Sequence, residues 1–349
     1  MIVSGRPSPP SPATTPRRWG RSRRSRPDSR CRTGAGKEKT EEEVMPTAAA
    51  WLILGLYLGH AVPLWPATLR RLRQRLGDGT ALLYLIPYLV AVRFSPAIGN
   101  LARFGLYVAL PVLLLRFLRR ERPHLGYLLA ALALWFPLEP DLFLLPWRSA
   151  TLPPLLQAVA LPDLSVPLAP GLALPLEKLT GVALALYLFT VQAPLPSVGF
   201  TYRLGREDLR TALIGLGAFA LVGLPVGLAW GFLRPGLSWP GVGPTVLGLL
   251  GGYLLVALPE EVLFRGVIQN LLAHRLSAGP ALPLAAVIFG LAHLNNATTG
   301  FPVPNGAYAV MATLAGLAYG WVWQRRRKVT ASAITHALVN AVWALAFGG

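Results

Sequence analysis

Apolar residues form runs of about 18 or more along most of the chain from Pro46 onward, separated by short polar gaps. Runs of this length predict helices that cross a bilayer, whereas a membrane β-barrel would alternate polar and apolar residues. The fold class that we predict is all-α: a polytopic transmembrane helical bundle of about 8–10 spans. The candidate spans lie near residues 48–66, 80–96, 102–118, 125–146, 178–193, 210–232, 244–272, 280–296, 305–323 and 329–347.

Basic residues fall on alternate gaps between these spans. The positive-inside rule places such gaps in the cytoplasm and puts residue 45 on the outside. The region 147–176 is apolar but rich in proline, which favours a loop with an interfacial piece over a span. The basic gaps, expected as cytoplasmic loops, are 70–75, 116–122, 202–210, 274–275 and 324–328.

Composition supports a membrane protein and argues against a soluble one. The chain is 53% hydrophobic and 14% charged, with a mean hydropathy of +0.49, whereas a soluble domain carries roughly 25% charged residues. The net charge of +18 would otherwise favour nucleic acid, but the basic residues beyond the first segment mark topology, so we expect no nucleic-acid partner. The single cysteine, Cys31, excludes an internal disulfide and a cysteine zinc site.

Residues 1–44 differ from the rest, as in "RRWGRSRRSRPDSR", and we expect them to form a disordered basic segment. We hypothesise that this segment is not translated and that Met45 is the start, because "EEEV" before it can encode a purine-rich ribosome-binding sequence. The alternatives are a basic tail attracted to anionic lipid and a transit peptide, although "EKTEEE" is acidic for the latter.

Several ionisable groups lie within the late spans, where each costs about 2.5–3.5 kcal/mol on insertion scales. Counted at 1.5 Å per residue, three helices bring their polar groups to one layer, roughly 12–20 Å from the cytoplasmic surface. We therefore expect these groups to meet around a single water molecule in a pocket open toward the cytosol. The candidates are Glu260, Glu261, Arg265, His293, His336 and Asn340.

A site of this composition suits the activation of water. A carboxylate in a low-dielectric cavity is a competent general base near neutral pH, and a neutral imidazole can share the water or pass on its proton. A second histidine and an amide can stabilise an oxyanion, at about 2.7–4 kcal/mol per donor. The reaction served is the hydrolysis of an acyl compound, most simply a peptide bond.

Purely structural interpretations compete with this one. Glu261 and Arg265 are four residues apart on one helix face and can form a structural clamp. Phe289 suits packing more than chemistry. Isolated histidines on apolar faces are usually core residues, which is the interpretation for His60, His124 and His274.

Three motifs occur in order on three late spans: Glu-Glu-x-x-x-Arg (260–265), Phe-x-x-x-His (289–293) and His-x-x-x-Asn (336–340). Together they resemble the CPBP family of intramembrane proteases, which includes the Rce1-like CAAX prenyl endopeptidase and bacterial bacteriocin-immunity or abortive-infection proteins. The resemblance covers residues 205–349 as a protease core and leaves 45–204 as accessory transmembrane helices.

The resemblance implies a role for each motif residue. Glu260 would activate the water with His293, while His336 and Asn340 would stabilise the oxyanion. The supporting residues would be Glu261, Arg265 and Phe289. We favour a site without a cofactor, since no His-Glu-x-x-His motif is present; if zinc is bound, the ligands would be Glu260, His293 and His336.

The expected substrate is a membrane-associated peptide or protein, prenylated and CAAX-like in the eukaryotic members. We expect a multi-pass protein of a bacterial cytoplasmic membrane, with lipid as its other partner. The alternative is a membrane protein without catalysis, namely a transporter or a scaffold, including a bacteriocin self-immunity protein. A transporter should show internal repeats, and we find no clear repeat.

Overall fold

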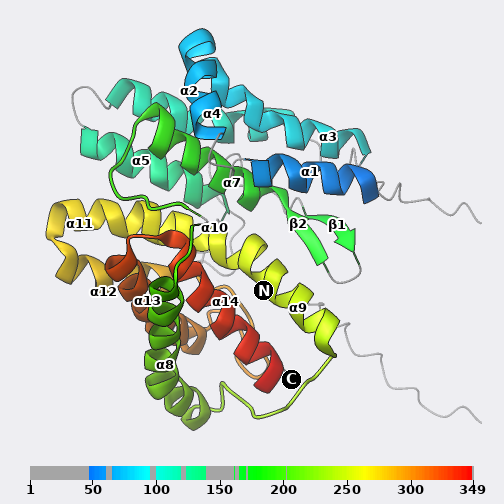
Figure 1. The fold of residues 1–349 in the computed structure, drawn as a ribbon, viewed down its shortest axis with the longest axis vertical. Coiled ribbons are helices and arrows are strands. Elements are labelled where there is room, and N and C mark those ends of the chain that lie inside the picture. The colour runs from blue at the N-terminus through cyan, green and yellow to red at the C-terminus, as the bar shows by residue number, and fades with distance from the viewer. Residues whose placement is uncertain are drawn as a thin grey trace, which may run out of the picture. The chain divides into compact units, whose positions relative to one another are not determined.

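The computed structural model describes residues 47–59, 65–94, 100–118, 123–138, 161, 165–169, 172–201 and 203–347. These residues belong to one compact unit, Met45–Gly349. The segment 1–44 and His60 lie outside the described residues, so the expectations for them stay predictions. The first group of helices is α1 (Thr47–Gly59), α2 (Trp65–Leu76), α3 (Ile86–Phe94), α4 (Leu101–Leu118), α5 (Pro123–Trp135) and α7 (Leu176–Tyr187), with 3₁₀ turns at Gly77–Leu85 and Phe136–Leu138 (Figure 1).

The second group of helices carries the late motifs. A continuous helix runs over Val242–Leu276 and comprises α9 (Val242–Gly251), α10 (Leu258–Glu261) and α11 (Asn270–Leu276), joined by π-helical turns at Gly252–Ala257 and Val262–Gln269. Figure 1 shows α12, α13 and α14 close together, with α8 against α13 and α14. Their bounds are α8 (Arg206–Ala229), α12 (Ala278–Leu291), α13 (Gly306–Arg326) and α14 (Val329–Ala346).

The all-α prediction is confirmed. Among the described residues, five helices are long and apolar enough to cross a membrane, and α12 and His124–Leu138 are shorter apolar helices. The five are Ala67–Arg93, Leu101–Leu118, Arg206–Ala229, Val242–Leu276 and Val329–Ala346. The boundaries between a basic segment, accessory helices and a core remain predictions.

Some local expectations were wrong. The basic run 70–75 lies inside α2 instead of a loop, because arginine, leucine and glutamine are all good helix formers. Residues 206–210, expected in a loop, form the first turns of α8. His124 and His274 are exposed, so neither is a core residue. In the region expected as a loop, β1 (Ser165–Ala169) and β2 (Leu172–Pro175) form an antiparallel hairpin with Val166 and Leu174 buried.

Helix α7 lies at the centre of the first group. Nearly every residue in it is buried, and a π-helical turn at Leu188–Gln192 continues it. It packs against α1, α5, α10 and the π-helical turn Val262–Gln269. Its burial on nearly all sides, Glu177 and Thr180 included, lets it support the helix that carries the two glutamates.

Small residues let α12 and α13 approach closely. A side chain added at Gly290 of α12 would meet Thr313 and the Ala309 carbonyl oxygen of α13, and one at Gly316 would meet Phe289 and Ala286. Close approach through small residues is the usual packing mode between membrane helices. This packing fixes the end of α12, where the first motif histidine lies.

The second group of helices has two chemically different ends. At the basic end, Arg326 and Lys328 each lie 2.7 Å from a carboxylate oxygen of the buried Asp208, and Gln324 donates to the Ala278 carbonyl oxygen. This end therefore gathers the segments 199–201, 203–210, 274–278 and 324–329. The opposite end, called the distal end below, gathers 230–238, 294–305 and 343–347. There the backbone N–H of Gly236 donates to the Ala346 carbonyl oxygen, and Phe232 packs on Phe301 and Trp343.

Candidate active site

The two glutamates lie on α10, a four-residue α-helical segment between two π-helical turns. Pro259 stands immediately before them and has no N–H to donate, so an α-helical hydrogen bond is lost at this point. π-Helical turns are rare and recur at functional sites. The winding brings Glu260 and Glu261 toward α14 on different sides of the helix.

Glu260 faces both motif histidines. Its Oε2 lies 4.0 Å from His293 Nε2 and 4.0 Å from His336 Nε2. The side chain of Glu260 is 18% exposed, and those of His293 and His336 are 14% and 5% exposed. Helices α10 and α14 and the turn after α12, which are distant in sequence, thus supply a carboxylate and two imidazoles to one largely buried site.

Hydrogen bonds at the far side of each ring fix how the two imidazoles face Glu260. His293 lies in the turn after α12, and its Nδ1 donates to the Phe289 carbonyl oxygen at 2.8 Å. His336 Nδ1 lies 3.1 Å from Glu261 Oε1. Because both partners accept, both Nδ1 atoms carry a proton, and the Nε2 atoms point at Glu260.

Glu261 is fully buried and serves the second histidine instead of the cavity. Besides His336, it contacts Arg265, whose Nε lies 3.1 Å from Oε2, and Ser332, whose hydroxyl donates to Oε2 at 2.5 Å. The Ser332 hydroxyl also lies 2.8 Å from the Tyr319 carbonyl oxygen. A carboxylate held on several sides in this way orients the imidazole that it contacts.

Two aromatic rings enclose this network. The Tyr319 ring stacks on the His336 ring, with centroids 4.5 Å apart and planes at 16°. The Arg265 guanidinium carbon lies 4.7 Å from the centroid of the Phe289 ring and 5.8 Å from that of Tyr319. Both arrangements are suited to cation–π attraction, which partly compensates a guanidinium that has no exposure to water.

A cavity of about 70 Å³ extends from the histidines. His293, His336 and Asn340 line its polar part, together with Tyr308 and Tyr319. The rest of the lining is apolar: Leu216, Phe219, Ala220, Leu224, Phe232, Leu233, Phe289, Met311, Ala312, Ala315, Val339, Val342, Trp343 and Phe347. A few convergent polar groups in an apolar cavity are typical of a substrate site.

A family model matches the part of the chain that holds this site. The model describes the type II CAAX prenyl endopeptidase, Rce1-like, and it matches residues 242–342. This stretch of the chain, which holds the three motifs, is therefore similar to the Rce1-like family. No curated protein and no solved structure matches the chain significantly. The Rce1-like family is a protease family, and with the five apolar helices this makes the chain an integral membrane protein.

The Rce1-like match contains all the predicted site residues. The structure brings Glu260, His293 and His336 together, and it places Asn340 on the wall of the same cavity. Glu261 and Arg265 form a buried pair beside them, and Phe289 packs between Arg265 and the His336 ring. The roles of these residues in catalysis stay predictions.

Sequence reasoning missed three neighbours of the site. Ser332 bonds to Glu261, Tyr319 stacks on His336, and the Tyr308 ring lies edge-on to His293 with centroids 5.1 Å apart. Ser332 precedes His336 by one helical turn, which is the only signal for it. The tyrosines lie on α13, which carries no motif, so nothing in the pattern distinguishes them from packing residues.

Zinc fits the side chains poorly as they lie. Tetrahedral zinc with bonds of about 2.0–2.1 Å separates its ligand atoms by about 3.3 Å, whereas both imidazoles lie 4.0 Å from the Glu260 oxygen. Within the described part of the chain, no three His, Cys, Asp or Glu side chains are grouped to hold a metal ion. The distances thus provide no ready-made tetrahedral cage.

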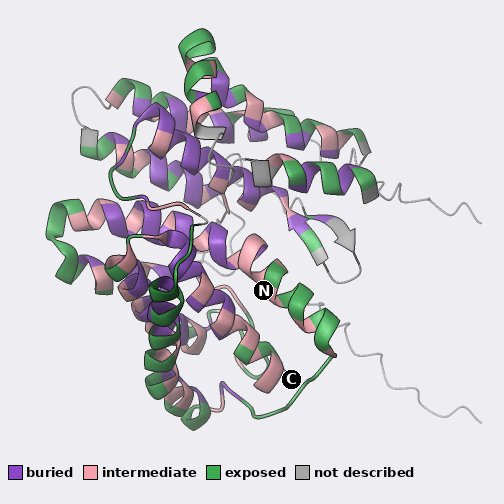
Figure 2. Ribbon diagram, viewed as in Figure 1, coloured by how far each residue is buried: buried purple, intermediate pink, exposed green. Residues whose placement is uncertain are grey.

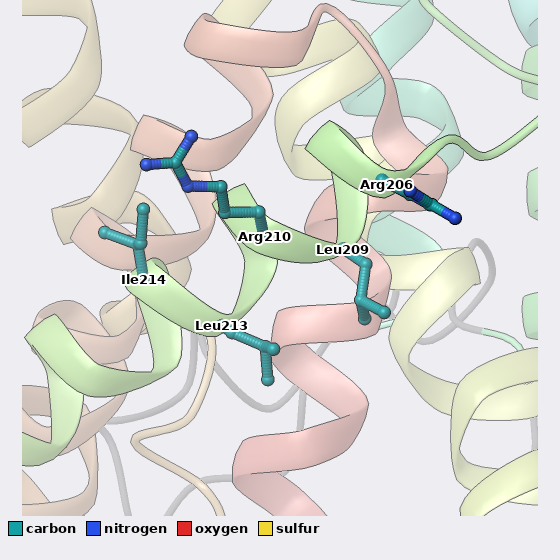
Figure 3. A pocket seen from close by; sticks show the side chains of 5 residues that line it. All are labelled: Arg206, Leu209, Arg210, Leu213 and Ile214. Carbon is teal, nitrogen blue, oxygen red and sulfur yellow. The ribbon is translucent and has the colours of Figure 1, made fainter.

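A second hollow lies on the surface of α8 near the basic end and is lined by Arg206, Leu209, Arg210, Leu213 and Ile214 (Figure 3). Figure 3 shows the two arginine side chains pointing in different directions, so they do not converge on one ligand. Both are surface residues of the first turns of α8. We assign no site to this hollow.

Proposed function

We propose that the chain is an intramembrane endopeptidase that hydrolyses a peptide bond of a membrane-associated substrate with a water molecule activated by Glu260. The observation that supports it is the equal 4.0 Å separation of Glu260 Oε2 from the two imidazole Nε2 atoms. This distance exceeds a direct hydrogen bond and suits two groups that share one small molecule. The match to the family model supports the protease class, and the geometry around Glu260 supports the Glu/His chemistry that we propose.

In the proposed reaction, Glu260 and His293 take a proton from the water while its oxygen attacks the carbonyl carbon of the scissile bond. The same proton then passes to the leaving amine nitrogen as the carbon–nitrogen bond breaks. One water is consumed, and a carboxylic acid and an amine are formed. Neither step requires an oxidant or a reductant.

The oxyanion would be stabilised from α14. The Asn340 amide can donate to it directly. The Glu261 carboxylate accepts from His336 Nδ1 and orients the ring, so that a proton on Nε2 can also be donated to the oxyanion. Glu261 and Arg265 are in this proposal positioning residues, because they act through His336 and do not reach the cavity.

The substrate that we propose is a membrane-associated peptide or protein tail, of which a prenylated, CAAX-like tail is one form. The apolar lining of the cavity supports a substrate with an apolar segment next to the scissile bond. We favour the reaction without a metal, since the side chains alone can supply a base, a proton carrier and oxyanion donors.

A comparison of membrane peptides from cells with the wild type or Glu260→Gln tests the proposal. We expect intact substrate peptides to accumulate in Glu260→Gln cells, and not in cells with Glu207→Gln, a matched variant of an exposed glutamate. If Glu260→Gln changes no peptide and is as active as wild type in cells, the chain is a scaffold and the proposal fails. Stoichiometric zinc in the purified wild-type protein would overturn the metal-free mechanism.

A further inference from the structure

The cavity reaches His293, His336 and Asn340 at one end. Its lining residues come from the distal parts of α8, α13 and α14, together with Phe232 and Leu233 in the loop after α8. Phe232, Trp343 and Phe347 belong to the segments that meet at the distal end. Figure 2 shows α14 buried over its first half and less buried toward its carboxyl end. The cavity therefore runs from the histidines toward the distal end.

The side of Glu260 that faces the basic end is filled by packed side chains. Arg265 and Gln269 continue the helix in that direction, and both have no exposure, as do Trp323 and Ser332 on the helices opposite. Gln269 also donates to the Gly320 carbonyl oxygen at 3.2 Å. The sequence predicted a pocket open toward the cytosol; the buried side chains named above fill the space between Glu260 and the basic end.

Charge then assigns the distal end to one side of the membrane. From residue 203 onward, the basic-end segments carry Arg203, Arg206, Arg210, Arg275, Arg325, Arg326, Arg327 and Lys328. The distal segments carry only Arg234. The positive-inside rule places the basic end in the cytoplasm, so the distal end faces the opposite side.

We propose that substrate enters this site from the extracytoplasmic side of the membrane, along the apolar cavity that leads to the two histidines, and that the substrate is a peptide with an apolar segment delivered to that side. This inference rests on the proposed function. The aromatic and aliphatic lining suits apolar side chains near the scissile bond, and the cavity is continuous with His293, His336 and Asn340. Within the proposed substrate class, this route admits a tail that reaches the extracytoplasmic side and excludes a lipidated, CAAX-like tail that remains in the cytoplasmic leaflet.

Cysteine labelling with a membrane-impermeant thiol reagent tests the side of entry, in full-length protein with Cys31→Ser. Ala220→Cys places the thiol in the cavity wall, and Ala218→Cys is its control on the exposed, lipid-facing side of the same helix. Ser238→Cys reports the distal end. Gly279→Cys reports the basic end, where an added side chain meets no atom within 4 Å.

In intact cells we expect Ser238→Cys and Ala220→Cys to be labelled, and Gly279→Cys and Ala218→Cys to remain unlabelled. In inverted membrane vesicles, Gly279→Cys should be labelled and Ala220→Cys should not. Labelling of Ala220→Cys only in inverted vesicles would overturn the proposal. Failure to label it from either side would do the same, because a closed cavity admits no substrate.

A second variant pair links the cavity to turnover. Val342→Trp fills the cavity wall at its distal part, whereas Val310→Trp adds the same bulk at an equally exposed position outside the cavity; the parent residues are 40% and 41% exposed. Peptides that accumulate with Glu260→Gln should also accumulate with Val342→Trp and not with Val310→Trp. If no peptide accumulates with Glu260→Gln, the proposed function itself is refuted. If peptides accumulate with Glu260→Gln but not with Val342→Trp, only the proposed entry route is refuted.

Discussion

Replacement of Glu261 by glutamine affects two interactions of this carboxylate: the contact that holds His336 and the ion pair with Arg265. The substitution keeps the shape of the side chain but leaves the guanidinium, which has no exposure, without its charge partner. Breaking a buried ion pair by removing one partner costs about 3–5 kcal/mol. We expect Glu261→Gln to lower the free energy of unfolding by about this amount.

The same variant should also lower the rate. An uncharged amide holds Nδ1 of His336 less firmly than a carboxylate does, so the second oxyanion donor is no longer held in place. The loss of one such donor lowers kcat by about 10²–10³-fold. The assay uses a peptide that accumulates with Glu260→Gln. Its rate of cleavage in detergent, divided by the amount of folded protein, gives the change in kcat. Tryptophan fluorescence during heating gives the change in the free energy of unfolding.

The double variant Glu261→Gln/Arg265→Met decides between the two interpretations of the pair. Removing the guanidinium removes the unpaired buried charge, and apolar replacements of buried ion pairs are often neutral, so most of the stability should return. The rate should stay about 10²–10³-fold low, because His336 is still unsupported. A double variant that regains both stability and rate would show that Glu261 and Arg265 form only a structural clamp.

Two further predictions concern packing and the basic end, both measured by thermal unfolding in detergent. Gly290→Ala should destabilise by about 1–3 kcal/mol, because the new methyl group meets Thr313 and the backbone of α13. Gly217→Ala, where nothing lies within 4 Å, should raise the free energy of unfolding by up to about 1 kcal/mol. If Gly290→Ala and Gly217→Ala change the free energy of unfolding equally, the packing argument is refuted. Asp208→Asn, which weakens contacts to Arg326 and Lys328, should lower the free energy of unfolding by about 1–3 kcal/mol. The variant of the exposed Glu207, Glu207→Gln, should lower it by less than about 1 kcal/mol. Similar losses for both would show that the buried pairs contribute little.

The convergence of the motif residues followed from spacing alone. Counting residues from the basic ends placed Glu260, His293 and His336 in one layer, and helices of regular rise preserve such a count. The count does not depend on how the helices pack. It therefore gave the right layer for His293, although the predicted span 280–296 placed this residue inside a helix and it lies in the turn after α12.

The features that depend on packing were not predictable in this way. Which side of the layer is filled is decided by the fit of Gln269, Trp323 and their neighbours, and a sequence pattern does not show that fit. The bond from Ser332 to Glu261 is hidden for another reason. A hydroxyl in a membrane helix commonly bonds to its own backbone, so a serine at this spacing carries little information. The helical run through 70–75 was obscured because arginines mark both loops and helix ends.

The π-helical turns on both sides of α10 set the angular phase of the two glutamates relative to the ends of their long helix. Each wider turn contains a residue beyond the α-helical repeat, and one residue corresponds to about 100° of rotation around an α-helix. Removal of a single residue from Gly252–Ala257 would leave the span nearly as long and as apolar as before. It would nevertheless rotate Val242–Gly251 relative to Glu260 and Glu261 around the helix axis. The length of this span and the direction in which its carboxylates point are therefore set by different features of the sequence.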